Sequence, residues 1–402
     1  MKKKNPPRKC DSRRKKAFIM GVCMLFISIL FGKIQSNAED NQSIDLESPS
    51  CILIEAQTGE VLYEKNSDEA MAPASVTKIM TLLLTFEAID KEQISMDDIV
   101  TVSEHAASMG GSQCFFEAGE EQTVEDMIKC IIIASGNDAA VAMAEKIAGS
   151  EEAFVNMMNE KARKLGMKNA CFKNACGLDV EGHKMSARDI ALMSRELITR
   201  YPAIFDYSGI WMDSIIHKTR RGESQFDLVN TNKFLNMYTG ATGLKTGYTN
   251  IAKYCMSATA SRDGIQLIAV IMGADTKDIR NDNACKLLDY GYSLCHKYTD
   301  DKVLQEDKIA IDKGTSNYVT IESDRKFEGI LLTGENAEDV TKKLEIKNNI
   351  NAPVKTGDKL GQISYYAGDR CLGCVNIYAA ENVDSMSMKY AFVKVFKLQF
   401  GY

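Results

Sequence analysis

The 402-residue chain has little proline, histidine and tryptophan, with six, four and one residues respectively. The low proline count and the 27 glycines exclude a collagen-like or low-complexity chain. A hydrophobic content of 45% excludes an intrinsically disordered one. The four histidines form no H-E-x-x-H or H-x-H pattern, and Cys371-Leu-Gly-Cys374 has no second C-x-x-C to complete a zinc site. We therefore expect neither a metal ion nor another cofactor.

Positive charge is scarce outside the first 38 residues. That segment holds ten Lys or Arg and one Asp, a net charge of +9, so the rest of the chain carries −15 of the total of −6. Recognition of phosphates needs a basic footprint, which the acidic body lacks. We expect no nucleic-acid partner.

The basic start has the three parts of a secretory signal. Residues 2–16 contain nine Lys or Arg, the run 17–32 is uncharged, and Ser36-Asn37-Ala38 is an A-x-A-like cleavage site. The uncharged run is 16 residues long, short for a bilayer span of about 20. We predict that residues 1–38 are a signal peptide and that the protein is exported. An uncleaved membrane anchor is the alternative.

Ten cysteines remain after residue 38. Exported chains rich in cysteine can be disulfide scaffolds, but those are small, and this chain is long enough to bury a core. Cys130 and Cys255 lie in apolar segments. We interpret them as buried free thiols.

The hydrophobic pattern of residues 39–299 predicts strands at both ends and helices between them. Strands are expected at 51–56, 61–65, 254–261 and 266–272, and helices at 75–89, 127–134, 138–148, 151–165, 186–200 and 278–296. This layout is typical of an α+β fold, in which a sheet built from both ends of the segment carries a helical cluster.

The chain changes character from about residue 303. Short β-rich runs at 303–311, 318–321, 329–332, 343–346, 359–365 and 375–378 alternate with turn clusters. We predict a small all-β domain over residues 300–385. Residues 386–402 mix aromatic and aliphatic residues with three lysines, which favours an amphipathic anchor at the outer face of the membrane. A docked terminal strand or helix is the alternative.

Ser75-Val-Thr-Lys78 is an S-x-x-K motif at the start of an apolar helix. Residues i and i+3 of a helix share a face, so the lysine amine is expected beneath the serine hydroxyl. A serine becomes a nucleophile when a base removes its proton, and a lysine buried near another cation has a lowered pKa that suits this role. The same letters occur at 12–15 and 323–326, and an N-capping serine with a solvated lysine explains most such matches.

Two further motifs could complete a site around Ser75. Ser135-Gly-Asn137 lies between two expected helices, where Ser135 could relay a proton and Asn137 could bind a substrate amide. A purely structural role, in which the glycine caps the first helix and the asparagine caps the start of the second, would explain the same residues.

The third motif, Lys245-Thr246-Gly247, precedes the second expected hairpin and is interpreted as an edge strand that lines a cleft. Lys245 and Thr246 would meet a substrate carboxylate, and Gly247 would admit the ligand to the backbone. The backbone N–H groups of Tyr248 and Ser75 would form an oxyanion hole. A second copy of the motif at 355–357 is explained by a hairpin turn.

These three motifs, in this order, form the set of β-lactamases and penicillin-binding proteins. Ser135-Gly-Asn-Asp-Ala139, Cys176-Gly-Leu-Asp179, Ser186-Ala-Arg-Asp189 and Gly243-Leu-Lys-Thr-Gly-Tyr-Thr249 resemble the low-molecular-weight penicillin-binding proteins, the serine-type D-alanyl-D-alanine carboxypeptidases. The resemblance covers about residues 45–380. The β-rich domain and the basic-aromatic tail of residues 386–402 also resemble that family's accessory domain and membrane anchor. The resemblance implies a β-lactamase/transpeptidase-like domain.

The resemblance implies that Ser75 attacks the D-Ala-D-Ala bond of a peptidoglycan stem peptide and that water hydrolyses the acyl-enzyme. Lys78 would be the base, and β-lactams would acylate Ser75 as substrate mimics. The resemblance also implies that Arg280 helps to hold the terminal carboxylate, although the residues just before it diverge from the family pattern.

Three alternatives stay open. A DD-transpeptidase or endopeptidase could use the same scaffold. A class A β-lactamase would have Ser-Asp-Asn in place of Ser135-Gly-Asn137 and no β-rich domain. It would also need a glutamate and an asparagine in a loop before Lys245 to activate water, and the sequence has no convincing E-x-x-x-N there. A non-catalytic wall-binding or sporulation scaffold would have no reason to keep Lys78, Asn137 and Lys245.

Overall fold

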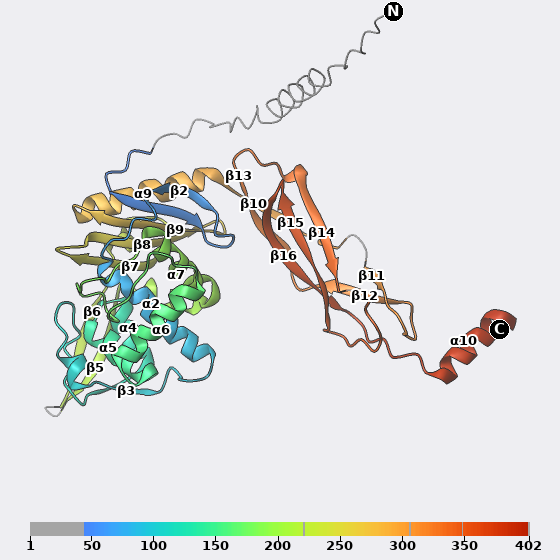
Figure 1. Ribbon diagram of the computed structural model, residues 1–402, viewed down its shortest axis with the longest axis horizontal. Helices are drawn as coiled ribbons and strands as arrows, with labels where there is room; N and C mark the ends of the chain where they lie inside the picture. The colour runs from blue at the N-terminus through green and yellow to red at the C-terminus, as the bar shows by residue number, and fades with distance from the viewer. Residues whose placement is uncertain (1–43, 220–221, 305–306, 348, 401–402) are drawn as a thin grey trace, which may run out of the picture. The chain divides into compact units, whose positions relative to one another are not determined.

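The computed structural model describes residues 44–219, 222–304, 307–347 and 349–400 (Figure 1). The elements below all belong to one compact unit that begins at Leu46. The predicted signal peptide, residues 1–38, lies outside the described residues.

A five-stranded antiparallel sheet has the order β2-β1-β9-β8-β7. Its strands are β1 (Ser50–Glu55), β2 (Val61–Lys65), β7 (Ala241–Thr249), β8 (Lys253–Arg262) and β9 (Ile265–Ala274). Strand β1 pairs with β9, with Ser50 opposite Met272. The predicted sheet built from both ends of the segment is therefore confirmed. Among the described residues, β7 pairs with β8 alone in this sheet, so it is the edge strand that the sequence predicted.

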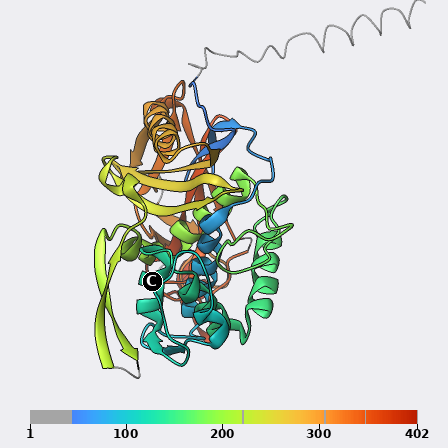
Figure 2. The same ribbon diagram turned by 90° about the vertical axis from the view of Figure 1, so that its left-hand side faces the viewer.

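Helices cover both faces of this sheet (Figures 1 and 2). Helix α9 (Lys277–Leu294) packs on one face and α7 (Ala187–Arg200) on the other. Beyond α7 lies the predicted helical cluster, formed by α2 (Lys78–Asp90), α4 (Val124–Ile132), α5 (Asn137–Ala148) and α6 (Glu151–Lys164). Helix α2 is buried on nearly every side, as expected for a helix without a polar face. The α+β architecture is confirmed.

Shorter elements connect these layers. They are η1 (Ala74–Thr77), β3 (Ile99–Thr101), α3 (Glu104–Ala107), β4 (Glu121–Thr123), η2 (Pro202–Ile204), α8 (Phe205–Ser208), β5 (Met212–Thr219), β6 (Gly222–Val229) and η3 (Lys233–Asn236). The β5–β6 hairpin was not predicted, because polar and charged residues of low β-propensity interrupt the apolar pattern of its largely exposed strands. The helix expected at 278–296 ends at Leu294, where a strand begins.

Residues from 295 onward form the predicted β-rich part. Its elements are β10 (Cys295–Asp300), β11 (Lys308–Ala310), β12 (Tyr318–Ser323), β13 (Phe327–Leu332), η4 (Ala337–Asp339), β14 (Val340–Ile346), β15 (Lys359–Ala367) and β16 (Arg370–Ala379). Five strands form a sheet of order β11-β12-β16-β15-β14, and β10 pairs with β13. The Phe327 and Tyr365 rings stack in its core, 3.6 Å apart. The division of the chain at residues 299 and 300 stays a prediction.

Helix α10 (Met388–Phe400) ends the described chain. Its described side chains include several exposed apolar ones: Met388, Tyr390, Phe392, Val393, Val395 and Phe396. Within the described residues, no helix combines the length and the apolar character needed to cross a bilayer.

Candidate active site

Ser75 lies in η1, a single 3₁₀ turn that leads directly into α2. Side chains three residues apart eclipse one another in a 3₁₀ helix. The Lys78 Nζ atom accordingly lies 3.1 Å from the Ser75 Oγ atom, to which it donates a hydrogen bond. The predicted α-helix over 75–89 is thus a 3₁₀ turn followed by an α-helix, and this tighter turn brings the two side chains together.

Lys78 is fully buried and its amine is surrounded by acceptors. Besides Ser75 Oγ, Nζ donates to the Asn137 Oδ1 atom at 2.5 Å and to the Cys176 carbonyl at 2.7 Å. Burial lowers the pKa of Lys78 to about 8, and the nearby Asp138 carboxylate opposes this shift. A large fraction of the amine is therefore neutral near pH 8 and able to accept a proton.

The S-x-N segment lies between α4 and α5 and contributes Ser135 and Asn137. The Asn137 amide links Lys78 to the Gly110 carbonyl, to which Nδ2 donates at 2.6 Å. Ser135 is nearly buried and has a left-handed backbone, with φ of 64°. In the described part of the chain, its hydroxyl forms no hydrogen bond to Ser75 or Lys78.

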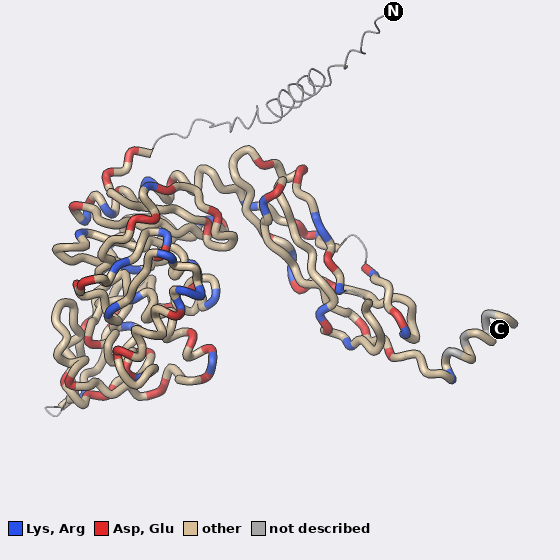
Figure 3. The backbone as a smooth tube through the Cα atoms, in the orientation of Figure 1, with Lys and Arg blue, Asp and Glu red and all other residues tan. Residues whose placement is uncertain are grey.

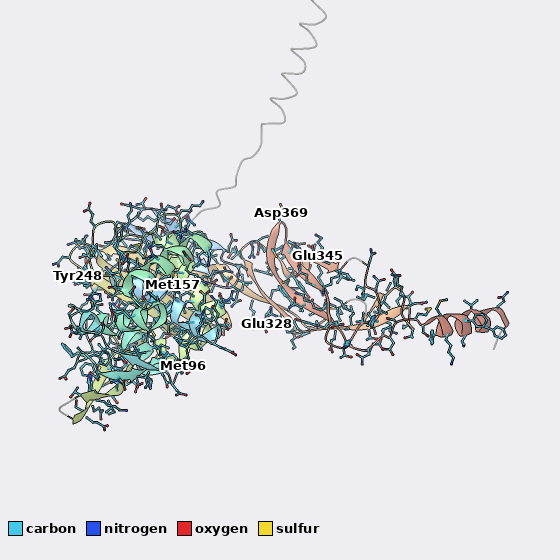
Figure 4. All side chains as sticks on the ribbon, turned by 60° about the horizontal axis from the view of Figure 1, so that its bottom comes forward. Met96, Met157, Tyr248, Glu328, Glu345 and Asp369 are labelled. Carbon is cyan, nitrogen blue, oxygen red and sulfur yellow. The ribbon has the colours of Figure 1, made fainter. Side chains whose placement is uncertain are left out.

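The edge strand β7 passes directly against the turn that carries Ser75. A Cβ atom at Gly247 would lie 2.9 Å from the Ser75 backbone nitrogen and 3.0 Å from that of Val76. Only a glycine permits this approach, which brings the backbone of β7 beside the Ser75 N–H. Tyr248 is half exposed at the edge of this domain, where it is labelled in Figure 4, and its ring centroid is 4.4 Å from that of Tyr254.

Two buried cations lie beside Lys78. Lys245 on β7 is almost fully buried, and its pKa is well below its usual value because of burial and the charges of Lys78 and Arg280. Arg280 on α9 is buried too, which lowers its pKa to about 10. The Thr246 hydroxyl is 3.4 Å from that of Thr231. The structure thus gathers the predicted basic side chains Lys78, Lys245 and Arg280 into one buried region.

Sequence reasoning missed several residues that support this arrangement. Gly177, with φ of +90°, packs so tightly that an added Cβ atom would lie 1.9 Å from the Ala74 carbonyl oxygen. A Cβ atom at Gly111 would lie 2.8 Å from Asn137 Nδ2. The Asp138 carboxylate accepts hydrogen bonds from the Cys114 backbone at 2.9 and 3.1 Å. The resembling segments 135–139 and 176–179 contain two of these residues but do not reveal their contacts.

His183 fixes the loop beside the Ser75 turn. Its Nδ1 atom accepts a hydrogen bond from the Lys173 backbone, so Nε2 carries the proton and donates to the Thr77 hydroxyl at 2.9 Å. Burial lowers the pKa of His183 to about 4, so it is neutral at pH 7. Its hydrogen bonds give it a structural role.

Two properties of the described residues bear on cofactors and disulfides. Among them, no group of three His, Cys, Asp or Glu side chains could hold a metal ion. The ten cysteines from Cys51 to Cys374 are free thiols, and only Cys371 and Cys374 are exposed.

Comparison with known proteins assigns two family models to the chain. Residues 35–276 match the D-alanyl-D-alanine carboxypeptidase family (Peptidase S11), and residues 292–385 match the penicillin-binding protein 5 C-terminal domain. The chain is 45% identical over 347 residues to the D-alanyl-D-alanine carboxypeptidase DacF of Bacillus subtilis, covering 86% of this chain and 88% of DacF.

Solved structures agree with this assignment. PBP3 of Streptococcus pneumoniae, described as a peptidoglycan synthesis regulatory factor, is 26% identical with a TM-score of 0.71, covering 85% of this chain and 100% of its own. Penicillin-binding protein 5 of Haemophilus influenzae is also 26% identical, with a TM-score of 0.66, covering 85% of this chain and 98% of its own.

Proposed function

This chain belongs to the D-alanyl-D-alanine carboxypeptidase family, and we propose from that premise which of its residues carry out the reaction. The protein is a serine-type D-Ala-D-Ala carboxypeptidase, a penicillin-binding hydrolase related to peptidoglycan. Its substrates are peptides that end in D-Ala-D-Ala, and it binds β-lactams. The assignment of roles to residues is our proposal, together with the stem pentapeptide as the physiological substrate.

Ser75 is the nucleophile and Lys78 is its base. The single observation that carries this proposal is the 3.1 Å hydrogen bond between Lys78 Nζ and Ser75 Oγ. Neutral Lys78 takes the hydroxyl proton while Oγ bonds to the carbonyl carbon of the penultimate D-Ala. The pKa of about 8 supports this step, because the neutral amine is then accessible near physiological pH.

The carbonyl oxygen becomes an oxyanion when Oγ adds to the carbonyl carbon. The backbone N–H groups of Ser75 and Tyr248 stabilise this charge. The close approach of Gly247 to the Ser75 nitrogen supports the pairing, because a side chain there would fill the space beside that N–H.

The terminal D-Ala leaves as a free amino acid when the C–N bond breaks. The proton held by Lys78 reaches the leaving amine through Ser135, and Asn137 binds the substrate amide. Lys245, Thr246 and Arg280 hold the terminal carboxylate. Burial of Lys245 and Arg280 supports this role, because neither forms an ion pair with a carboxylate among the described residues and a substrate carboxylate would supply one. Water then hydrolyses the ester and releases the shortened peptide.

Two assays test this scheme. Purified protein lacking residues 1–38 is expected to bind labelled penicillin covalently and to release D-Ala from a diacylated D-Ala-D-Ala peptide. Ser75→Ala is expected to abolish both activities. Ser323→Ala, in the second S-x-x-K match of the mature chain, is the matched control and should retain both.

The outcomes separate the alternative functions. Label on Ser75→Ala would refute the nucleophile assignment. Rapid turnover of penicillin would favour a β-lactamase, and transfer of the acyl group to an added amine in preference to water would favour a transpeptidase. A folded protein with neither label nor D-Ala release would favour a wall-binding scaffold.

We also propose that the protein is exported and attached to the outer face of the membrane through residues 386–402. The exposed apolar side chains of α10 support this placement, because they would bury their surface at the bilayer interface.

A further inference from the structure

The Cys176 carbonyl, one of the three acceptors around Lys78 Nζ, lies in a loop between α6 and α7 and belongs to no helix or strand. A carbonyl in a helix or strand is held by the backbone hydrogen bonds of its element. A loop carbonyl has no such support, so other contacts must keep this oxygen 2.7 Å from Nζ.

Two side chains bind the peptide groups around this carbonyl. The Gly177 N–H, which lies in the same peptide plane as the Cys176 carbonyl, donates to the Asn174 Oδ1 atom at 2.6 Å. The Ala175 carbonyl accepts a hydrogen bond from the hydroxyl of Thr81, on α2, at 2.6 Å. These bonds fix the loop on the side of α2 and leave the Ala175 N–H to a further partner.

That partner is Glu151, the first residue of α6. Its Oε1 atom accepts a hydrogen bond from the Ala175 N–H at 2.9 Å, and its Oε2 atom lies 2.8 Å from His105 Nε2 on α3. Both carboxylate oxygens are thus engaged, and the side chain is only 17% exposed. The amino-terminal end of a helix carries a partial positive charge, which suits an acidic acceptor at this position. Glu151 therefore connects two helices to the loop.

Glu151 can act on the reaction through the loop without touching the substrate. Ala175 is bonded to Cys176 and each peptide unit is rigid, so a shift of the Ala175 N–H is passed to the Cys176 carbonyl. That carbonyl and Asn137 Oδ1 hold the lysine Nζ beside Ser75 Oγ. Loss of one acceptor would let the amine turn away from the hydroxyl. It would also favour the neutral amine, because hydrogen-bond acceptors stabilise the charged form.

Resting on the proposed function, in which Lys78 is the base, we propose that Glu151 is a positioning residue for the reaction. By holding the Ala175 N–H, it keeps the Cys176 carbonyl against Nζ and so directs the amine at Ser75 Oγ. The bonds that form and break are unchanged, because Glu151 exchanges no proton with the substrate.

The pH dependence of acylation reports this role. The titratable groups that act on the Lys78 amine are Cys176, Asp138 and Cys114, and Lys245 on β7 is affected by its charge in turn. A substitution at Glu151 leaves all of them in place. A shift in the Lys78 midpoint would then arise in one of two ways, from the moved carbonyl or from the lost charge of Glu151 itself.

Two variants separate the carbonyl position from the charge. Glu151→Asp keeps the charge at the start of α6 but is one methylene too short to reach the Ala175 N–H. Its plateau rate of penicillin acylation should fall roughly tenfold, because the base is no longer aligned with the hydroxyl. Its midpoint between pH 6 and 10 should move down by about half a pH unit, because an acceptor is lost. Glu151→Gln loses the charge but keeps an oxygen for the N–H, and it should retain both the plateau and the midpoint.

The same two changes at Glu152 are the matched controls, because Glu152 is the next acidic residue in the first turn of α6 and is exposed. Both should leave the profile unchanged, and thermal unfolding verifies that each variant is folded. An unchanged profile for Glu151→Asp, or a Glu151→Gln variant as impaired as Glu151→Asp, overturns the positioning role. A profile without a rising limb in the unaltered protein would instead overturn the base role of Lys78 on which the proposal rests.

Discussion

At the scale of a single residue, the proposed role of Lys78 places two opposing requirements on its surroundings. As the proposed base, it must be neutral to accept the Ser75 proton, and burial favours the neutral amine by lowering its pKa to about 8. It must also be held in place, and three oxygen acceptors provide that, although they favour the charged amine. The Asp138 carboxylate adds to this second effect. The resulting pKa lies close enough to neutral pH for the amine to lose and regain a proton in each cycle.

The rate of acylation should therefore rise with pH and level off above about pH 8. The sign follows from the base role, because the fraction of neutral Lys78 increases as pH rises through its pKa. The measurement is the second-order rate of penicillin acylation between pH 6 and 10. Asp138→Asn should move the midpoint to lower pH, because it removes a charge that raises the pKa of Lys78. A profile without a rising limb would contradict the assignment of Lys78 as base.

Individual residues of the site could be predicted because their side-chain types and spacing in the sequence indicate a particular chemistry. Ser75, Lys78, Asn137 and Lys245 stand in short motifs, and the structure brings them together. The supporting contacts could not be predicted, because they join residues far apart in the chain. Cys176, for example, contributes only its backbone carbonyl to Lys78, a role that any residue type could fill.

Regular elements were predictable where the local sequence determines them. The Ser186-Ala-Arg-Asp189 segment forms a full capping box at the start of α7, and Thr123 caps α4. The turn η1 was expected as part of an α-helix, because its 3₁₀ geometry depends on tertiary contacts with β7 and the loop 177–183. The prediction therefore differed from the structure at elements whose conformation depends on residues far away in the chain.

Gly177 provides a test at the scale of this loop. Gly177→Ala should destabilise the protein by about 1–3 kcal/mol and reduce penicillin acylation strongly, because the new methyl group would collide with the Ala74 carbonyl beside Ser75. Thermal unfolding and the acylation rate measure the two effects. Gly182→Ala is the control, since Gly182 also has a positive φ but its nearest neighbour is a flexible lysine side chain at 3.4 Å. Equal acylation by the two variants would show that the contact with Ala74 does not shape the site.

At the scale of the whole molecule, charges of both signs are interspersed over the described chain (Figure 3). The basic side chains of the candidate site are the exception, because they are buried in a chain that carries a net charge of −15 after residue 38. With the residue roles proposed above, such a site would attract the carboxylate end of a peptide without making the surface basic.

Residues 386–402 provide a test at the scale of the whole molecule. Removal of residues 386–402 should abolish flotation of the mature protein with anionic phospholipid vesicles and leave penicillin acylation unchanged, because α10 contributes apolar side chains but no site residue. Phe392→Ser/Phe396→Ser should weaken flotation in the same way, since both rings are exposed. Thr356→Ser, in the β-rich part, is a control expected to keep binding. Flotation of the shortened protein equal to that of the full one would exclude the tail as the anchor.

The pairing of β1 with β9 has a consequence for the order in which the protein can fold. Strand β1 is made early, yet its partner at Met272 and the edge strand that supports Ser75 follow near the end of the same domain. Contacts between such distant segments form slowly, because the intervening chain must close into a loop. During synthesis, Ser75 and Lys78 are therefore present in the chain long before the site around them can form. Activity can arise only once strands β7 to β9 have joined the sheet, which makes it a direct report on completed folding.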